Sequence, residues 1–410
     1  MTPPPQEHRG RAGGEDWAVA ALRWFSTTVP VVLVALVVAP LVIEGGTVVP
    51  WRPVMTELGT MIVVATQMIE GQVVFGTATT ANFAWTPFGA ILLVPLALSG
   101  PLLWQLGSIV ATVSALVHLL RRLLGLDGRA LLLAGVAVVI MVEPVRTTLG
   151  VGQISLLVVL LVVVDLMAPM SPKAPPRRRL LPTGVLTGIA AGIALTPAWV
   201  LLALLLAGHR RVALTGLATA ASCLLVGWIV MPGQSEGLLE FAGPDPVGAL
   251  WASNQSLAGA LARWHVAPIL AGVLALVVAA AGAWAASRWW RDQPVLALGV
   301  VLLASLMPLN PAWTWQFVGV VVLGAGLLRG WDRLPKGLAV TAATLAVWTA
   351  VALPQLVASG SAVPGPWESA LAAVGPLLGV AVIAVAGVAA PPRPALTRPV
   401  AARVVEKTPN

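Results

Sequence analysis

Charged residues are scarce in this sequence. Asp, Glu, Lys and Arg make up 10% of the 410 residues, whereas an average soluble domain has about 25%. The apolar fraction is 58% and the mean hydropathy is +0.91. This composition excludes an ordinary soluble protein. Apolar runs of roughly 15–22 residues recur along the chain, which predicts a single all-α polytopic transmembrane helical bundle.

Cysteine and metal-binding motifs are also rare or absent. The single cysteine, Cys223, lies in an apolar run, which excludes a disulfide framework and favours a packed thiol. The sequence has no Asp-x-Asp pair, no phosphate-binding P-loop and no cluster of metal ligands. We therefore expect no metal and no cofactor, and these absences argue against a cytosolic nucleotide-sugar enzyme or an ATPase.

The basic residues that are present orient the chain. All 24 Lys and Arg residues except Arg52, Arg146 and Arg263 lie in alternate loops or in the terminal segments. By the positive-inside rule, this asymmetry predicts about twelve membrane segments with both termini in the cytoplasm. The net charge of +8 is thus explained by topology and needs no nucleic-acid partner.

The predicted organisation is one membrane domain, residues 24–390, between two polar ends. Residues 1–23 are rich in Pro, Gly and charge, which is typical of a disordered cytoplasmic leader. The first apolar run, 24–43, lacks a small-residue cleavage site and is expected to stay as an anchor. Residues 391–410 form a predicted cytoplasmic tail. Two polar segments are predicted outer loops, 44–82 and 232–265.

Some apolar segments are interrupted. The stretch 83–120 is too long for one straight span and is broken at Gly100 and Pro101. Residues 180–193 and 194–207 are each too short to cross about 30 Å of hydrocarbon at about 1.5 Å per residue. They predict short broken helices that line a cavity. Further spans are expected at 130–142, 153–169, 212–231, 266–287, 294–308, 312–328, 337–356 and 369–390.

Residues 143–155 interrupt two apolar runs and carry Glu143, Arg146 and Gln153. Charged side chains at membrane depth are costly unless they pair or line a wet cavity, so they indicate a functional site. Because Glu143 and Arg146 are three residues apart, they could also pair on a helix with a purely structural role. The predicted topology places this segment on the outer side, together with the polar residues Glu57, Thr196, Asn254, Gln255, Arg263, Asn310 and Gln316.

Four segments, in order, resemble the bacterial α-1,2-mannosyltransferase family of GT-C polyprenyl-phosphate-sugar-dependent membrane glycosyltransferases, of mycobacterial type. Residues 143–155 match the family's EPVR, short gap, then GQ. Residues 188–197 are similar to its GLA and LTP motif, and residues 254–263 match a segment that begins Asn-Gln-Ser. Glu57-Leu58 followed by 83–88 resembles DL and F-x-Y-P-P-F. The likeness covers roughly residues 24–330.

The resemblance implies an inverting hexosyltransferase of the cell membrane. Such an enzyme moves a sugar, here mannose, from a polyprenyl-phosphate donor to a lipid-linked acceptor, a cell-envelope glycolipid, on the extracytoplasmic side. Inverting transfer requires a carboxylate that deprotonates the acceptor hydroxyl, and Glu57 is the candidate. It also requires cations at the departing phosphate, and Arg146 and Arg263 are the candidates.

Other polar residues are candidates for contacts with the sugar or the acceptor. Side-chain amides can both donate and accept hydrogen bonds to hydroxyls, but they could equally satisfy backbone groups of broken helices. Several of the seventeen Trp residues, such as Trp264, Trp289, Trp331 and Trp367, fall at span ends as an interfacial belt does. Trp313 could stack on a sugar or simply pack. The candidates for sugar or acceptor binding are Glu143, Gln153, Asn254, Gln255, Trp313 and Gln316.

The chain departs from the family pattern at three places. Glu57 stands where the family has Asp, Ala194 replaces a Lys before Leu-Thr-Pro, and Gln316 lies in a segment without the family's histidines. The last two changes favour an alternative, a catalytically impaired relative that binds lipid-linked sugar or partners an active enzyme. A lipid or sugar transporter is a third class. It ranks lowest because ionisable groups gather on the outer side, with Asp165 as the exception.

Overall fold

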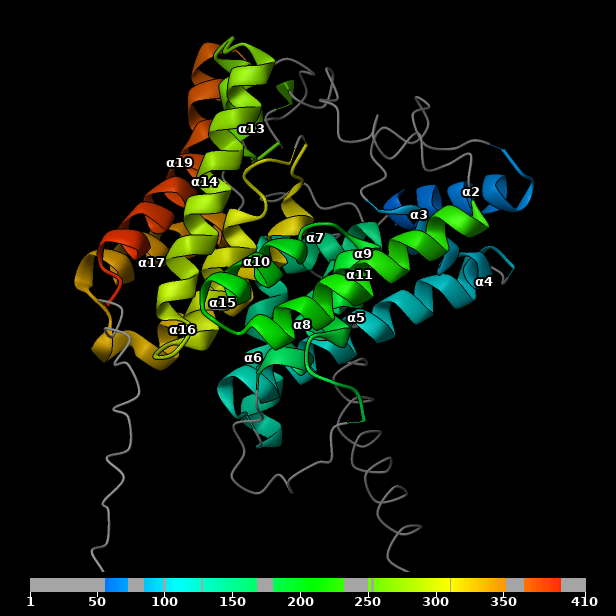
Figure 1. The fold of residues 1–410 in the computed structure, drawn as a ribbon, viewed down its shortest axis with the longest axis horizontal. Coiled ribbons are helices and arrows are strands. Elements are labelled where there is room, and N and C mark those ends of the chain that lie inside the picture. The colour runs from blue at the N-terminus through cyan, green and yellow to red at the C-terminus, as the bar shows by residue number, and fades with distance from the viewer. Residues whose placement is uncertain are drawn as a thin grey trace, which may run out of the picture.

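The computed structural model describes residues 56–72, 85–98, 101–126, 128–167, 180–231, 250–251, 254–309, 311–351 and 365–391. Every regular element in these ranges is a helix, which confirms the all-α prediction (Figure 1). Some predictions fall outside the described residues. These are the leader 1–23, the first span 24–43, nearly all of the tail 391–410, Asn310 and parts of the two outer loops.

Four helices in the described part of the chain are long and apolar enough to cross a membrane. A fifth span is possible if two consecutive helices, bent by 80°, count as one: α6 (Arg129–Met141) and α7 (Glu143–Val151). The predicted number of about twelve is therefore not confirmed. In Figure 1, α14 and α19 run side by side, while α5 and α11 cross the molecule in another direction. The four long helices are α5 (Pro101–Leu124), α11 (Arg210–Val230), α14 (Pro268–Trp289) and α19 (Pro366–Val388).

The predicted interruptions are confirmed. Pro101 begins α5, after the short helices α3 (Pro87–Ile91) and α4 (Val94–Ala97). The pair of short segments becomes α9 (Val185–Ile193) and α10 (Ala198–Leu206), and both contact α11. Residues with φ and ψ outside the helical region, such as Ala194, separate the two.

One predicted loop is a helix. The sequence predicts a polar outer loop over 44–82, but α2 spans Thr56–Ile69 within it. Apolar residues recur at helical spacing there, since Met61, Val64, Ala65 and Met68 are all buried. This face packs toward α4, so the acidic residue in its first turn, Glu57, is fixed by a packed element.

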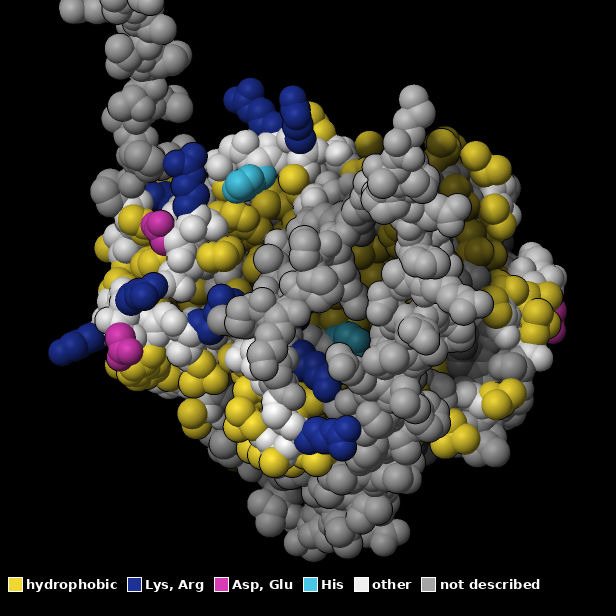
Figure 2. Space-filling view, turned by 90° about the horizontal axis from the view of Figure 1, so that it is seen from below, with side chains coloured by type: hydrophobic (Ala, Val, Ile, Leu, Met, Phe, Trp, Pro, Cys, Tyr) yellow, Lys and Arg dark blue, Asp and Glu magenta, His cyan; other side chains and the backbone are white. Residues whose placement is uncertain are grey.

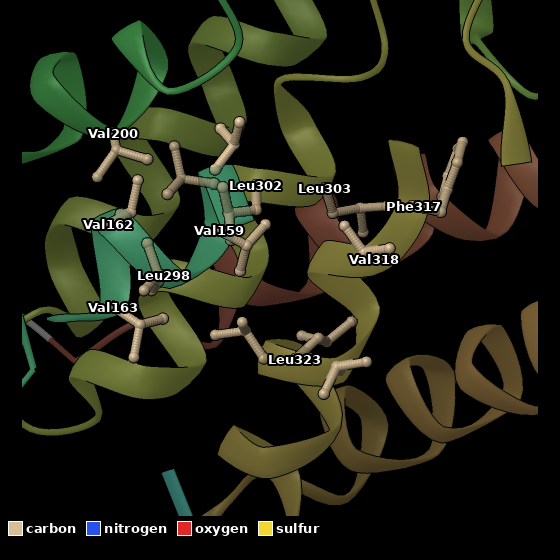
Figure 3. Packing of buried hydrophobic residues seen from close by; sticks show 14 of the residues in the cluster. Val159, Val162, Val163, Val200, Leu298, Leu302, Leu303, Phe317, Val318 and Leu323 are labelled. Carbon is tan, nitrogen blue, oxygen red and sulfur yellow. The ribbon is translucent and has the colours of Figure 1, made fainter. Parts of the chain in front are cut away.

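Buried apolar residues form the core of the described structure. Valines of α8 (Ser155–Leu166) meet leucines of α15 (Pro294–Ala304) and of α16 (Gly319–Gly330), as Figure 3 shows. Phe317 and Val318 anchor η2 (Thr314–Val318) to this core. Close packing of this kind leaves η2 little freedom to move. The remaining elements are α13 (Leu257–Arg263), η3 (Trp331–Arg333) and α17 (Lys336–Val351).

Basic side chains gather on one face of the molecule, as Figure 2 shows. Basic residues begin α11 and α17 and end α14 and α16, at Arg210, Lys336, Arg288 and Arg329. This agrees with the alternation of basic loops in the sequence. That this face is cytoplasmic remains a prediction.

The tryptophans divide into exposed and buried groups. Trp264, Trp331 and Trp367 are all exposed at helix ends, as the interfacial belt requires. Trp289 is different from the prediction, because it is buried and its indole Nε1 donates a 2.9 Å hydrogen bond to the Ala386 carbonyl. Helix α19 covers it, which the position of Trp289 at a span end did not reveal.

Candidate active site

Glu57 and Gln153 meet although 96 residues separate them. The Gln153 side-chain amide donates a hydrogen bond of 3.3 Å to Glu57 Oε2. Glu57 lies in the first turn of α2, and Gln153 follows directly after α7. Burial raises the pKa of the Glu57 carboxyl to about 7, and the hydrogen bond from Gln153 opposes that shift. A carboxyl with this pKa can take up a proton near neutral pH.

Gly152 makes this contact possible. It ends α7 in the left-handed conformation, with φ +76°, and its N–H bonds to the Thr148 carbonyl. A Cβ at this position would lie 2.6 Å from Cβ of Leu58, the residue after Glu57. A side chain here is therefore excluded by both conformation and space. Gly192 of α9 has a similar role, because a Cβ there would lie 2.4 Å from Cβ of the buried Cys223.

Helix α7 carries two buried charged side chains. Thr147 Oγ1 donates a 2.8 Å hydrogen bond to Glu143 Oε1. Glu143 Oε2 and Arg146 Nε have no hydrogen-bond partner among the described residues. Both side chains are almost inaccessible, with exposures of 1% for Glu143 and 6% for Arg146. Their unpaired polar atoms indicate a site for a ligand, because a buried group without a partner costs about 1–3 kcal/mol.

Asn254 organises the start of α13. Its Oδ1 accepts hydrogen bonds from the backbone N–H groups of Ser256, at 3.1 Å, and Ala312, at 3.0 Å. The next residue, Gln255, donates its own N–H to the Ala312 carbonyl at 2.9 Å. Ser256 Oγ caps the helix by accepting from Gly259 N–H. These bonds join α13 to the segment that leads into η2.

Arg263 ends α13 and turns back toward its beginning. Its Nη1 donates to the carbonyls of Trp251, at 2.9 Å, and Asn254, at 3.0 Å. The Nε and Nη2 groups are buried and have no partner among the described residues. Burial lowers the pKa of the guanidinium to about 10, so it remains charged at neutral pH. A buried guanidinium with N–H groups that no described residue accepts is suited to an anion.

The segment before η2 completes this side. Gln316 Oε1 accepts a 2.8 Å hydrogen bond from the Trp313 backbone N–H, so Gln316 caps its own helix. Trp313 is 5% exposed, and its ring lies 5.4 Å, centroid to centroid, from the ring of Trp251. Trp313 therefore packs on another indole. Helix α7, which carries Arg146, contacts η2.

The break between α9 and α10 is tied to α3. The Thr86 N–H bonds to the Ile193 carbonyl at 3.0 Å, and the Thr86 hydroxyl bonds to the Gly192 carbonyl. At the other end of α9, Asp165 accepts hydrogen bonds from the N–H groups of Gly184 and Thr187. Asp165 is thus a helix cap, and its carboxylate has a structural explanation.

The structure brings together only some of the predicted site residues by direct contact. Glu57 meets Gln153, and Arg263 meets Asn254. Helix α7, which lies just before Gln153, contacts η2, and the segment before η2 bonds to Asn254. Sequence reasoning missed Trp251, whose carbonyl and ring both take part, and Thr147. Trp251 lies at the edge of a long polar segment, and only its spatial neighbours distinguish it from an interfacial indole.

Comparison with known proteins gives a match to one family. Residues 83–311 match the model of glycosyltransferase family 87. The chain is 32% identical over 323 residues to a Mycobacterium tuberculosis protein named polyprenol-phosphate-mannose-dependent alpha-(1-2)-phosphatidylinositol mannoside mannosyltransferase. That match covers 69% of this chain and 72% of the relative.

A second relative is a Mycolicibacterium smegmatis polyprenol-phosphate-mannose-dependent alpha-(1-2)-phosphatidylinositol pentamannoside mannosyltransferase. It is 33% identical over 267 residues, which are 60% of this chain and 61% of the relative. No solved structure matches the chain. The family match extends over more than half of the sequence and includes residues 143–155, 188–197 and 254–263. The chain therefore belongs to glycosyltransferase family 87.

Proposed function

We propose that this protein is a mannosyltransferase that moves mannose from a polyprenyl-phosphate donor to a phosphatidylinositol-mannoside type of acceptor. The reaction takes place at the extracytoplasmic side of the cell membrane, with both termini in the cytoplasm. The observation that carries the proposal is the contact of Glu57 with Gln153. Gln153 lies inside the family match, whereas Glu57 lies before it. The fold therefore brings a carboxyl from outside the matched region into contact with a side-chain amide of the family motif.

Glu57 is the general base in this reaction. Its carboxylate removes the proton of an acceptor hydroxyl, and the resulting oxygen attacks C1 of the mannosyl group. The new C1–O bond forms as the bond from C1 to the phosphate oxygen breaks, and the phosphate keeps the electron pair. Attack from the side opposite the phosphate inverts the anomeric centre.

Arg146 and Arg263 hold the departing phosphate. Arg146 Nε and Arg263 Nε and Nη2 are buried without a partner among the described residues, and guanidinium groups bind phosphate oxygens in a charge-assisted geometry. Negative charge grows on the phosphate as the bond breaks, so these cations stabilise the transition state more than the ground state. They also offset the absence of a lysine at Ala194.

The polar residues around them orient the sugars, but in different ways. Glu143, Gln153 and Gln255 are the proposed contacts for hydroxyl groups. Asn254 Oδ1 and Gln316 Oε1 already accept backbone hydrogen bonds, so these two side chains act by holding α13 and η2 in place. Trp313 supports the same segment by packing on Trp251.

The test is a transfer assay with the purified full chain in liposomes. The sugar donors are polyprenyl-phosphate mannose, polyprenyl-phosphate glucose and a nucleotide-activated mannose, and the acceptor is a phosphatidylinositol mannoside. We expect product only with the first donor. Measurable binding of polyprenyl-phosphate mannose without any product would instead favour the catalytically impaired relative that Ala194 and Gln316 suggest. Transfer from the nucleotide sugar would contradict the proposed donor class.

A further inference from the structure

Trp348, in α17, has a buried indole N–H that no described residue accepts. Within the described ranges, no other tryptophan has a buried Nε1 without a partner. Trp331 and Trp367 are 52% and 63% exposed, while buried Trp289 donates its Nε1–H to the Ala386 carbonyl. An indole N–H buried without an acceptor costs free energy. Trp348 therefore calls for an explanation that packing at a span end does not give.

Gly375 of α19 allows the indole to approach a second polar group. A Cβ on Gly375 would lie 2.5 Å from Gln255 Oε1 and 3.0 Å from Trp348 Nε1. Both side chains thus lie against the backbone of α19 at the same point. The next residue, Pro376, lies inside the helix and has no N–H to give to the carbonyl four residues earlier. Gly375, which has no side chain, and Pro376, which has no N–H, are therefore adjacent where Gln255 and Trp348 approach α19.

The location is next to the proposed site. Gln255 follows Asn254, whose carbonyl accepts a hydrogen bond from Arg263. Helix α17 contacts α7, which carries Arg146, and it also contacts α19. Trp348 therefore belongs to an element that touches one of the two arginine-bearing helices, while its neighbour Gln255 lies in the segment joined to the other.

We propose that Trp348 Nε1 and the Gln255 amide, brought together at Gly375, form a subsite for a sugar hydroxyl. An indole N–H donates only, so its ligand is an oxygen with a free lone pair. A hydroxyl fits better than a second phosphate, because the pair carries no charge. A hydroxyl can also receive the indole hydrogen bond and return its own proton to Gln255 Oε1. The inference rests on the proposed function and adds a specificity-determining residue, Trp348, to it.

The hydroxyl can come from the mannosyl donor or from the mannoside acceptor, and kinetics distinguishes the two. The variant Trp348→Phe keeps an apolar ring and removes the N–H. We expect KM to rise about 3- to 10-fold for the substrate that supplies the hydroxyl, the range for one lost hydrogen bond, with kcat nearly unchanged. Single-deoxy analogues of that substrate identify the group, since the matching analogue loses nothing further in Trp348→Phe.

One further variant controls for effects on folding, and another tests the subsite a second time. Trp289→Phe removes a buried indole N–H elsewhere, so it should lower the melting temperature without changing either KM. Gly375→Ala places a methyl group against both polar atoms and should raise the same KM as Trp348→Phe. If Trp348→Phe leaves both KM values within twofold of wild type, the subsite is wrong.

Failure of the subsite differs from failure of the proposed function. If wild type transfers mannose and Trp348→Phe behaves identically, only the subsite fails. If wild type shows no transfer, equilibrium binding of polyprenyl-phosphate mannose and of phosphatidylinositol mannoside replaces KM. Weaker binding of one of them by Trp348→Phe then still supports the subsite, and equal binding, or no binding by wild type, overturns it.

Discussion

Glu57 and Arg263 stand in two regions that hold their polar side chains differently. In the α2–α7 region (Glu57, Glu143, Arg146 and Gln153), the polar contacts are between side chains, such as that of Gln153 with Glu57. In the α13–η2 region (Asn254, Gln255, Arg263, Trp313 and Gln316), side chains bond mainly to backbone groups. The polar side chains of the second region therefore hold the backbone in place, whereas those of the first region contact one another and support little backbone structure.

This difference assigns separate consequences to substitutions. A change at Glu57 removes a proton acceptor and little structure. A change at Asn254 leaves backbone N–H groups without acceptors. We therefore expect substitutions in the α2–α7 region to change the rate of transfer and substitutions in the α13–η2 region to change stability. Four experiments test this difference.

The largest effect is expected for Glu57→Gln. Loss of a general base lowers kcat by about 10²- to 10⁴-fold. The melting temperature should hold or rise, because burial already disfavours the charged form of Glu57. Glu70→Gln is the matched control, since Glu70 is an exposed carboxylate just after the same helix. A rate loss in Glu70→Gln equal to that in Glu57→Gln would point to a general effect of charge.

Asn254→Ala should chiefly destabilise the fold. Two buried backbone N–H groups lose their acceptor, at about 1–3 kcal/mol each, so we expect about 2–6 kcal/mol less free energy of unfolding. Gln316→Ala removes one such bond and should cost about half as much. Thermal unfolding in detergent measures both. A stable Asn254→Ala with a large loss of kcat would reverse the assignment of the two regions.

Gly152→Ala tests how Glu57 is positioned. A methyl group would collide with Leu58 and strain the left-handed backbone, which shifts α2 and Glu57 away from the acceptor. We expect transfer to fall about 10- to 100-fold, since small misplacements of catalytic groups have effects of this size. Gly59→Ala is the control. Gly59 lies in α2, beside Leu58, but nothing lies within 4 Å of its added methyl. Equal activity of both variants would show that the contact with Leu58 does not position the base.

The smallest effect is expected for Gln153→Leu. The hydrogen bond from Gln153 lowers the pKa of Glu57, so its loss should move that pKa above about 7. Less of the carboxyl is then ionised at neutral pH, and transfer falls a few-fold at pH 7. Raising the pH should restore that part of the loss. A loss that is the same at every pH would place Gln153 in substrate binding alone.

Much of the fold follows from local sequence. Pro101 and the short segments on either side of Ala194 marked breaks that the structure contains. Gly152, after a charged segment, ends a helix in the left-handed conformation, which glycine adopts more readily than other residues do. These features depend on a few neighbouring residues, which is why the sequence reveals them.

Other features depend on partners far away in the chain. The acidic residues around Glu57 are typical of a loop, so the composition of this segment does not indicate the helix α2. Only the spacing of Met61, Val64 and Met68 indicates a helix with a buried face. The contact of Glu57 with Gln153 joins residues 96 positions apart. The role of Gln316 as a cap likewise depends on the fold of its own turn, and composition cannot distinguish it from a sugar ligand.

The most direct measurement of the central claim, that Glu57 is the base, is the pH dependence of mannosyl transfer by the wild-type protein. A base acts when deprotonated, so the logarithm of kcat/KM should rise with pH with a slope of one at low pH. It should level off above about pH 7, near the raised pKa of Glu57. The residual activity of Glu57→Gln should lack this inflection. A wild-type profile that is flat between about pH 5 and 9, or an inflection that persists in Glu57→Gln, would contradict the account.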